Sequence, residues 1–268
     1  MSRAKKIREK HGSVIAAAAT RFVDHEAMSP ERVLAWLEQF TDEDLPLAMQ
    51  LLDNIRYYNG NDIRELAKTL LQTILTELDE PLYKQIAIVP LGGVGSGTGT
   101  VIRAITGVPS NGRWTVVQML ELVRTRGAGI NAIVFVDDFS GSGKTIEKWW
   151  ATVEPVVRPL DIQLVVGLLV LNYRAAPIIK SSVGSLVYAA ELQKNDDVFD
   201  PTCGMFSAEQ QQRLLWYADK TKCKPKYRRG FGDCGLILSF KHGCPNNSLP
   251  TLWYGDGGWV PLFMRRAI

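Results

Sequence analysis

Two adjacent acids and the small-residue turn that follows them are the part of this sequence best suited to chemistry. Asp137 and Asp138 are separated by one residue from the turn, which reads Ser140-Gly141-Ser142-Gly143. A turn of this kind, placed before a helix, aims several backbone N–H groups and the positive end of the helix at one point in space. The pattern therefore predicts a phosphate site directly after two carboxylates.

The same residues include the end of a nucleotide-binding P-loop, whose pattern is G-x-x-x-x-G-K-[ST]. That pattern requires a glycine five positions before Gly143, and this sequence has Asp138 there. A carboxylate at this position would face the anion that a P-loop cradles. A P-loop phosphotransferase is therefore the least favoured of the functional hypotheses.

A strand and a helix are expected to position these residues. Residues 133–136 are apolar and rich in β-branched types, which indicates a buried central strand that ends at the acids. Residues 145–150 have the composition of a helix start. The alternative is an ordinary strand, turn and helix in which the acids only cap the helix.

Residues 133–145 resemble the signature of the type I phosphoribosyltransferases, in which an apolar strand and two acids precede a short loop and T/S-G-x-T. In that family the acids hold the ribose hydroxyls of phosphoribosyl pyrophosphate (PRPP), partly through Mg²⁺, and the loop binds the 5′-phosphate. The resemblance implies that Asp137 and Asp138 are the catalytic acids and indirect Mg²⁺ ligands. It implies a phosphate-binding loop made of Ser140, Gly141, Ser142, Gly143, Lys144 and Thr145.

One position departs from that family. Several purine-using members carry an acid at the position of Gly141, where it handles the proton on the base, and glycine has no such group. The resemblance therefore implies binding of PRPP, but it does not imply the proton transfer on the base that those members perform.

A second glycine-rich loop follows an expected strand at residues 86–90. Many glycines directly after a strand let the backbone approach a ligand and present N–H groups to it. Type I phosphoribosyltransferases place their pyrophosphate loop after the first strand of the sheet. The resemblance therefore assigns pyrophosphate binding to Gly92, Gly93, Gly95, Ser96 and Gly97. The alternative is a mobile surface loop.

The order of the expected elements predicts an α/β fold with a mainly parallel sheet, of the Rossmann-like phosphoribosyltransferase type, and an N-terminal helical module. Residues 1–82 are expected to be helical, with a capped helix start at Ser29-Pro30-Glu31 and a capping-box pattern at Thr41 and Asp44. Residues 83–268 form the expected phosphoribosyltransferase-like domain, which ends in an irregular C-terminal cap. Further strands are expected at 164–171, 186–190 and 235–240, and a helix at 114–123.

Composition limits the classes of protein to consider. The chain has 268 residues, of which 46% are hydrophobic and 22% charged, as in soluble globular proteins. No apolar run reaches membrane-spanning length and no signal peptide is recognisable, so we expect a cytoplasmic protein without membrane contact. The four cysteines form no C-x-x-C pair, and free thiols are favoured over zinc ligands.

A basic run lies in the last quarter of the chain. Six cations occur between residues 220 and 229, with no acid among them and with Tyr227 inside the run. Such a run can hold a nucleic-acid backbone or an acidic partner, and a solvated loop is the alternative.

The C-terminal segment carries a second, narrower resemblance. The pattern PNN-S-LP…W…PLF begins at Pro245 and, with the VDDF core and the N-terminal helices, resembles the phosphoribosyltransferase-like proteins of bacterial conflict systems. Some of these accompany retron reverse transcriptases in anti-phage defence, so the resemblance implies an effector or toxin with a reverse transcriptase or nucleic-acid partner. The alternative is a turn at Pro245 followed by core residues Trp253 and Trp259.

Three functional hypotheses follow. The first is a defence effector that binds PRPP or a related ribose 5-phosphate donor with Mg²⁺ and transfers or cleaves a glycosidic or pyrophosphate linkage. The second is a non-catalytic module of the same fold that binds a nucleotide or a partner, and the third is the P-loop phosphotransferase. The sequence leaves open the acceptor, the oligomeric state and any antitoxin.

Overall fold

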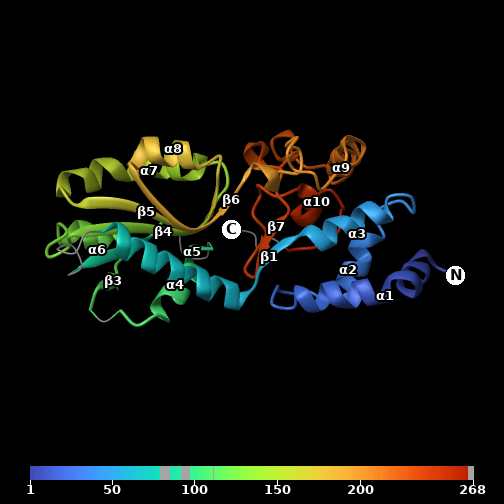
Figure 1. The fold of residues 1–268 in the computed structure, drawn as a ribbon, viewed down its shortest axis with the longest axis horizontal. Helices are drawn as coiled ribbons and strands as arrows, with labels where there is room; N and C mark the ends of the chain where they lie inside the picture. Colours follow the sequence, from blue (N-terminus) through green and yellow to red (C-terminus); the bar gives the residue numbers. More distant parts are fainter. Residues whose placement is uncertain (79–84, 92–96, 111, 265–268) are drawn as a thin grey trace. The chain divides into compact units, whose positions relative to one another are not determined.

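The computed structural model describes residues 1–78, 85–91, 97–110 and 112–264, and these residues divide into two compact units (Figure 1). Residues 61–193 form one unit, called here the sheet unit. Residues 1–60 and 194–267 together form the other, called here the split unit because it combines the two ends of the chain. The expected boundary at 82/83 thus differs from the division that the structure shows.

The sheet unit is built on five parallel strands in the order β3-β2-β4-β5-β6. Their bounds are Ile86–Pro90 for β2, Trp114–Val116 for β3, Ala132–Ser140 for β4, Gln163–Asn172 for β5 and Ser185–Leu192 for β6. The central strands β4 and β5 are long apolar runs with few exposed residues. Strands of this composition are covered on both faces, as in α/β folds. The predicted α/β class with a parallel sheet is confirmed.

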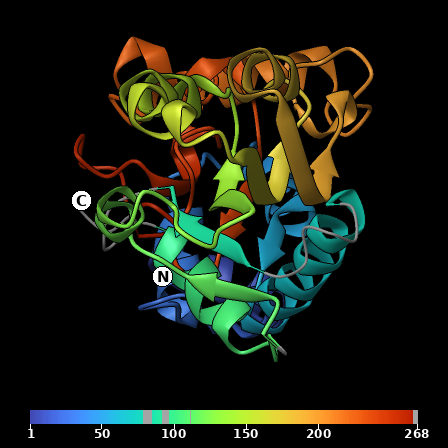
Figure 2. The same cartoon turned by 90° about the vertical axis from the view of Figure 1, so that its left-hand side faces the viewer.

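Helices cover both faces of this sheet. Their bounds are Gly60–Glu77 for α4, Thr98–Thr106 for α5, Met119–Arg124 for α6, Lys144–Val157 for α7 and Ala176–Val183 for α8. On one face, Trp150 of α7 and Ile179 of α8 share a buried core with Phe135 of β4. On the other, Leu70 of α4 lies against Gly167 of β5. Figures 1 and 2 show α7 and α4 on opposite sides of the strands.

The helix expected over residues 114–123 is only partly present. Trp114–Val116 is strand β3, paired in parallel register with β2, and the helix α6 begins at Met119. Leu122 is the buried residue of α6, whereas Leu120 is 80% exposed. The prediction was wrong over the first five residues, three of which form β3, because a free sheet edge overrides a weak helical spacing.

The split unit joins the N-terminal helices to the last quarter of the chain. Its first elements are α1 at Arg3–Arg21, α2 at Pro30–Leu37, α3 at Leu45–Asn54 and β1 at Arg56–Tyr58. Its later elements are α9 at Ala208–Lys220, β7 at Leu238–Phe240 and α10 at Pro250–Trp253, with short 3₁₀ turns at Lys194–Asp196, Pro225–Tyr227 and Phe231–Asp233. Strand β1, which the sequence analysis missed, pairs in parallel with β7.

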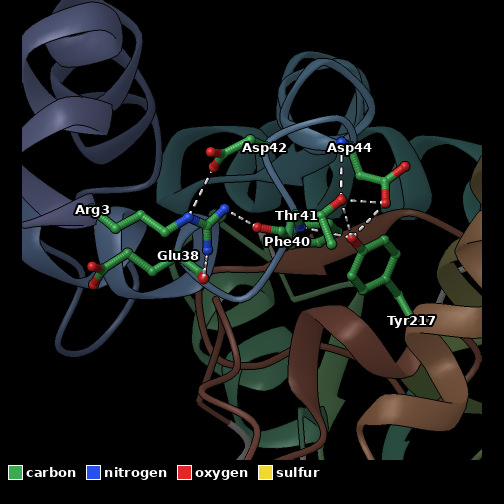
Figure 3. A network of polar contacts seen from close by, with 7 residues as sticks. All are labelled: Arg3, Glu38, Phe40, Thr41, Asp42, Asp44 and Tyr217. Atoms are coloured by element: carbon green, nitrogen blue, oxygen red, sulfur yellow. Dashed lines mark hydrogen bonds and ion pairs between the residues drawn. The ribbon is translucent and has the colours of Figure 1, made fainter.

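The start of α3 is tied to α9 by a buried polar network (Figure 3). The Tyr217 hydroxyl donates to Asp44 Oδ2 at 2.7 Å and accepts the Thr41 N–H at 2.9 Å. Thr41 Oγ1 donates to the same carboxylate at 2.8 Å and accepts the Asp44 N–H at 3.3 Å. The expected capping box is not formed: α3 begins at Leu45 with Asp44 as its N-cap and no side-chain capping bond, and the Asp44 carboxylate holds α9 instead.

The C-terminal segment belongs to the core of the split unit. Trp253 and Trp259 are each 7% exposed, and their indole N–H groups donate to the carbonyls of Ser248 and Thr251 at 3.0 and 2.9 Å. Asn247 Nδ2 donates to the Phe231 carbonyl at 2.7 Å. The C-terminal motif thus has a packing role in the structure, and the strand expected at 235–240 is shortened to β7.

Two further features concern the cysteines and the helices. All four cysteines are free, and Cys203, Cys234 and Cys244 are buried. Within the described ranges, no helix has the length and apolar character needed to cross a membrane.

Candidate functional site

The two acids lie at the carboxyl end of the central strand β4. The strand continues through them to Ser140, four residues further than the sequence indicated, with Asp137 paired to Leu168 and Ser140 to Leu171 of β5. Ligands of open parallel sheets bind at this edge, outside the carboxyl ends of the strands. The acids and the first residue of the predicted phosphate loop are therefore at the edge where a ligand is expected.

The phosphate loop makes a tight turn between β4 and α7. Gly141, Ser142 and Gly143 are buried, whereas Lys144 and Thr145 are exposed at the first turn of α7. Such a helix start presents backbone N–H groups and a partial positive charge to an anion. The loop that the sequence assigned to phosphate thus lies directly before a helix N-terminus, where an anion can bind.

Gly143 is the position in this loop where glycine is required. Its φ is +75°, in the left-handed region. A Cβ atom there would lie 3.0 Å from Ile178 Cβ and 3.2 Å from the Ala175 carbonyl oxygen. The start of α8 therefore packs directly against the loop and fixes its shape.

The turn after β5 supports this packing and was not recognised in the sequence. Asn172, the last residue of β5, is 1% exposed, and its Oδ1 accepts the Arg174 N–H at 3.2 Å. The Ala175 N–H donates to the Asn172 carbonyl at 2.8 Å, which places the Ala175 carbonyl against Gly143. An asparagine directly after an apolar strand was the available signal, since its side chain favours such a turn.

Asp137 is held by a residue that the sequence analysis did not select. Thr98, the first residue of α5, donates from Oγ1 to Asp137 Oδ1 at 2.7 Å, and the Asp138 N–H donates to the same oxygen at 3.0 Å. Thr98 is 1% exposed. The structure thus joins the helix that follows the glycine-rich stretch to the acid pair. The only sequence signal was a hydroxyl residue directly after Gly97.

The electrostatics of the acid pair favour a positive or hydroxyl-bearing ligand. Burial, followed by the adjacent charge of Asp138, raises the pKa of Asp137 well above its usual range, while the hydrogen bond from Thr98 lowers it. A carboxyl group whose ionised form is disfavoured in this way gains from a nearby cation or from hydrogen-bond donors. Two adjacent carboxyl groups at a strand end can bind ribose hydroxyls directly or through a metal ion.

The structure places only the end of the predicted pyrophosphate loop. Gly92, Gly93, Gly95 and Ser96 lie outside the described residues. Gly97 immediately precedes α5 with helical dihedral angles, φ −51° and ψ −29°. The part of the loop next to Thr98 is therefore connected to the acid pair through the bond to Asp137.

The acid pair fits a metal ion that takes few of its ligands from the protein. Within the parts of the chain that the structure describes, no group of three or more His, Cys, Asp or Glu side chains could enclose a metal. Mg²⁺ keeps several waters and binds through one or two carboxylates plus ligand phosphates. Asp137 and Asp138 suit this mode, in which most of the ligands come from water and substrate.

Solved structures of low sequence identity resemble about half of the chain. Orotate phosphoribosyltransferase of Mycobacterium tuberculosis, in complex with inorganic phosphate, is 19% identical over 49% of this chain and 71% of its own, with a TM-score of 0.33. A hypothetical protein from Neisseria gonorrhoeae with bound ppGpp is 15% identical over 52% and 85%, with a TM-score of 0.35. Xanthine-guanine-hypoxanthine phosphoribosyltransferase of Helicobacter pylori is 14% identical over 52% and 89%, with a TM-score of 0.32.

Among curated proteins there is no match. A family model, by contrast, matches residues 33–265, which is most of the chain and spans both units. This match covers the acid pair, the phosphate loop and the C-terminal motif. The chain therefore belongs to the PRTase-CE family, a family of phosphoribosyltransferase-like domains associated with conflict systems.

Proposed function

We propose that this protein binds PRPP or a related ribose 5-phosphate donor at the carboxyl end of β4 and acts on it as a phosphoribosyltransferase-like effector of a conflict system. The observation that carries the proposal is the placement of Asp137 and Asp138 at the end of a parallel strand, directly before a buried glycine turn and a helix N-terminus. Carboxylates accept hydrogen bonds from ribose hydroxyls, and the turn, three residues further along the chain, can donate backbone N–H groups to a phosphate.

Each group of the donor has a partner in this arrangement. The 5′-phosphate would accept hydrogen bonds from the backbone N–H groups of the loop, with charge from Lys144 and a hydroxyl from Thr145, both of which are exposed. The ribose hydroxyls would meet Asp137 and Asp138. Thr98 would keep Asp137 in place through the 2.7 Å bond.

Mg²⁺, when bound, would supply positive charge shared between the donor oxygens and the two carboxylates. The residues from Gly92 to Gly97 would present backbone N–H groups to the pyrophosphate. In a transfer, the bond between ribose C1 and the pyrophosphate oxygen breaks with its electron pair on the pyrophosphate, and C1 bonds to the acceptor. Directed N–H groups stabilise such a leaving group as its charge develops.

A non-catalytic module is the second candidate, and Gly141 is the observation that favours it. Glycine has no side chain to take or give a proton at the position where several purine-using relatives of the fold carry an acid. A module of this kind would bind the donor and report its presence to a partner, such as a reverse transcriptase or a nucleic acid in a defence complex. It would release no pyrophosphate.

Calorimetry combined with a pyrophosphate assay tests both candidates. PRPP, ribose 5-phosphate, NAD and ATP are titrated into the full chain with and without Mg²⁺. The proposal expects PRPP to bind more tightly than ATP, and Mg²⁺ to strengthen PRPP binding. Binding with pyrophosphate release supports the transferase, and binding without release under every acceptor tried supports the module. Preference for ATP over PRPP would contradict the transferase and favour a nucleotide-binding module.

A further inference from the structure

Four lysines at and after the end of α9 have no role in the proposed ribose site. Lys220, Lys222, Lys224 and Lys226 are all exposed. Among the described residues none of the four is paired with a carboxylate. Four unneutralised charges within seven residues attract polyanions.

The structure separates these lysines from the two arginines of the same basic run. Arg228 donates to both carboxylate oxygens of Asp219, at 2.7 and 2.9 Å, so its charge is neutralised. The guanidinium of Arg229 lies 4.6 Å from the centre of the Phe199 ring. The six cations that look equivalent in the sequence therefore differ: Arg228 is paired with a carboxylate, Arg229 lies over a ring, and the four lysines have no carboxylate partner among the described residues. Of these lysines, Lys226 lies over the Tyr227 ring, with Nζ 5.0 Å from its centre.

An exposed tryptophan adjoins the lysines. Trp216 of α9 is 38% exposed, although aromatic residues on helices of this size are mostly buried. Lys220 Nζ lies 4.6 Å from the centre of its ring, and the Arg213 guanidinium lies 4.5 Å from it. Arg213 is held by Asp44, with Nε 3.2 Å from Oδ1. Lys220 has no such anchor in the described chain and can leave the ring.

We propose that this lysine–tryptophan surface, made of Trp216, Lys220, Lys222, Lys224 and Lys226, binds single-stranded nucleic acid. The lysines neutralise backbone phosphates, and Lys220 moves from the Trp216 ring to a phosphate while a base stacks on the ring. Positive charge along a backbone path with an aromatic stacking platform is how proteins bind single strands without sequence preference. The surface lies wholly within the split unit and does not depend on the proposed ribose site.

The aromatic ring is the reason to prefer a nucleic acid over an acidic polypeptide. An acidic polypeptide would use the lysines alone, whereas an unpaired base has a flat face that Trp216 can cover. A duplex hides its base faces and would use the lysines alone as well. Phosphates and base faces are common to DNA and RNA, so the two are expected to bind alike.

Fluorescence anisotropy with a labelled, mixed-sequence 20-nucleotide strand tests the lysines. Four phosphate contacts predict a slope of about −2.8 in log K against log salt, or about 50-fold weaker binding at 200 mM than at 50 mM salt. Lys222→Gln/Lys224→Gln should reduce the slope to about −1.4. Lys6→Gln/Lys10→Gln is the matched control, since it removes the same charge from two exposed lysines of α1. It should leave the slope unchanged.

A second variant tests the ring. Trp216→Leu should weaken binding of single-stranded DNA and of RNA of the same sequence about tenfold. It should leave binding of a duplex and of poly-glutamate unchanged, and circular dichroism should show an intact fold. The proposal is overturned if Trp216→Leu binds single strands as the wild type does. The proposal would also be overturned if Lys222→Gln/Lys224→Gln and Lys6→Gln/Lys10→Gln changed the salt slope equally. Binding of poly-glutamate as tight as that of the single strand would overturn it too.

Discussion

Replacing Thr98 by valine tests whether α5 positions the acid pair for a ribose ligand. Valine keeps the shape of threonine and removes only the hydroxyl that donates to Asp137 Oδ1 at 2.7 Å. Thr98 is 1% exposed, so water cannot readily replace this donor. Among the residues that the structure describes, the Asp138 N–H is then the donor left on that oxygen, and the carboxyl group can turn away from its position.

The expected loss of ligand affinity follows from the kind of hydrogen bond that is removed. Hydrogen bonds to charged groups contribute about 1.5–3 kcal/mol. The bond also stabilises the protein without ligand, so only part of its free energy is lost from binding. We expect a loss of about 1–2 kcal/mol in the free energy of ligand binding, which corresponds to a 5- to 30-fold weaker affinity. Asp137→Asn would remove the ionisable group, whereas Thr98→Val keeps the carboxyl group, frees its position and raises its pKa.

Calorimetry with two ligands separates a change in the position of Asp137 from a disturbance of the whole site. Under the proposed function, ribose 5-phosphate would engage the acids and the loop, whereas inorganic phosphate would engage the loop alone. Thr98→Val should weaken the binding of ribose 5-phosphate and leave the affinity for inorganic phosphate within about twofold of the wild type. Thr98→Ser, which keeps the hydroxyl, should bind both ligands as the wild type does. Unchanged ribose 5-phosphate affinity in Thr98→Val would refute the positioning role. Equal loss for both ligands would show that the variant disturbs the loop itself.

Further predictions concern the loop and the split unit. Gly143→Ala should cost about 1–2 kcal/mol of stability and abolish phosphate binding, since a Cβ would lie 3.0 Å from Ile178 Cβ at a φ of +75°; wild-type phosphate affinity in this variant would contradict the account of the loop. Asp44→Asn should lower the free energy of unfolding by about 2 kcal/mol in urea, because it removes the carboxylate that Tyr217 and Arg213 share. The control Asp42→Asn, at a side chain that is 81% exposed, should cost less than about 0.5 kcal/mol. Hydrogen bonds from Arg213, Tyr217 and Thr41 lower the pKa of Asp44, so its contribution should be complete above about pH 5 and disappear as the pH falls through the folded-state pKa; an Asp44→Asn deficit that does not shrink as the pH falls would argue against this origin.

The sheet could be predicted from the sequence because its central strands are local signals. The apolar runs at 86–90 and 164–171 lie in strands of the structure, as does the run that ends at the acids. Edge strand β3 was missed because three residues beside a helix carry little signal of their own. Strand β1 was missed because its partner β7 is about 180 residues away, and no local pattern encodes such a pairing.

The division of the chain into units was harder to predict for the same reason. The strong helical spacing of α4 suggested a helical module, although Leu70 of α4 packs on the sheet at Gly167. Periodicity shows that a helix has an apolar face, but it does not show what covers that face. The C-terminal tryptophans likewise required the structure to show that they fill the core with the N-terminal helices.

In the candidate site, the sequence could indicate the residue types but not the contacts between distant segments. The acids and the loop are consecutive in the chain, so their proximity follows from the pattern. The bond from Thr98 to Asp137 joins residues 39 positions apart. The contact of the Asn172 turn with Gly143 likewise depends on the neighbouring strand and on α8.

Calorimetric titration of PRPP into the wild type and into Asp137→Asn/Asp138→Asn, with Mg²⁺ present, tests the central claim most directly. The substitution keeps the shape of both side chains and removes their charge. Asp161→Asn is the control, because it makes the same change at an exposed position in the sheet unit. The account predicts PRPP binding by the wild type and the control, and at least 100-fold weaker binding by the double variant, about 3 kcal/mol. Equal PRPP affinity in the double variant and the wild type would contradict it.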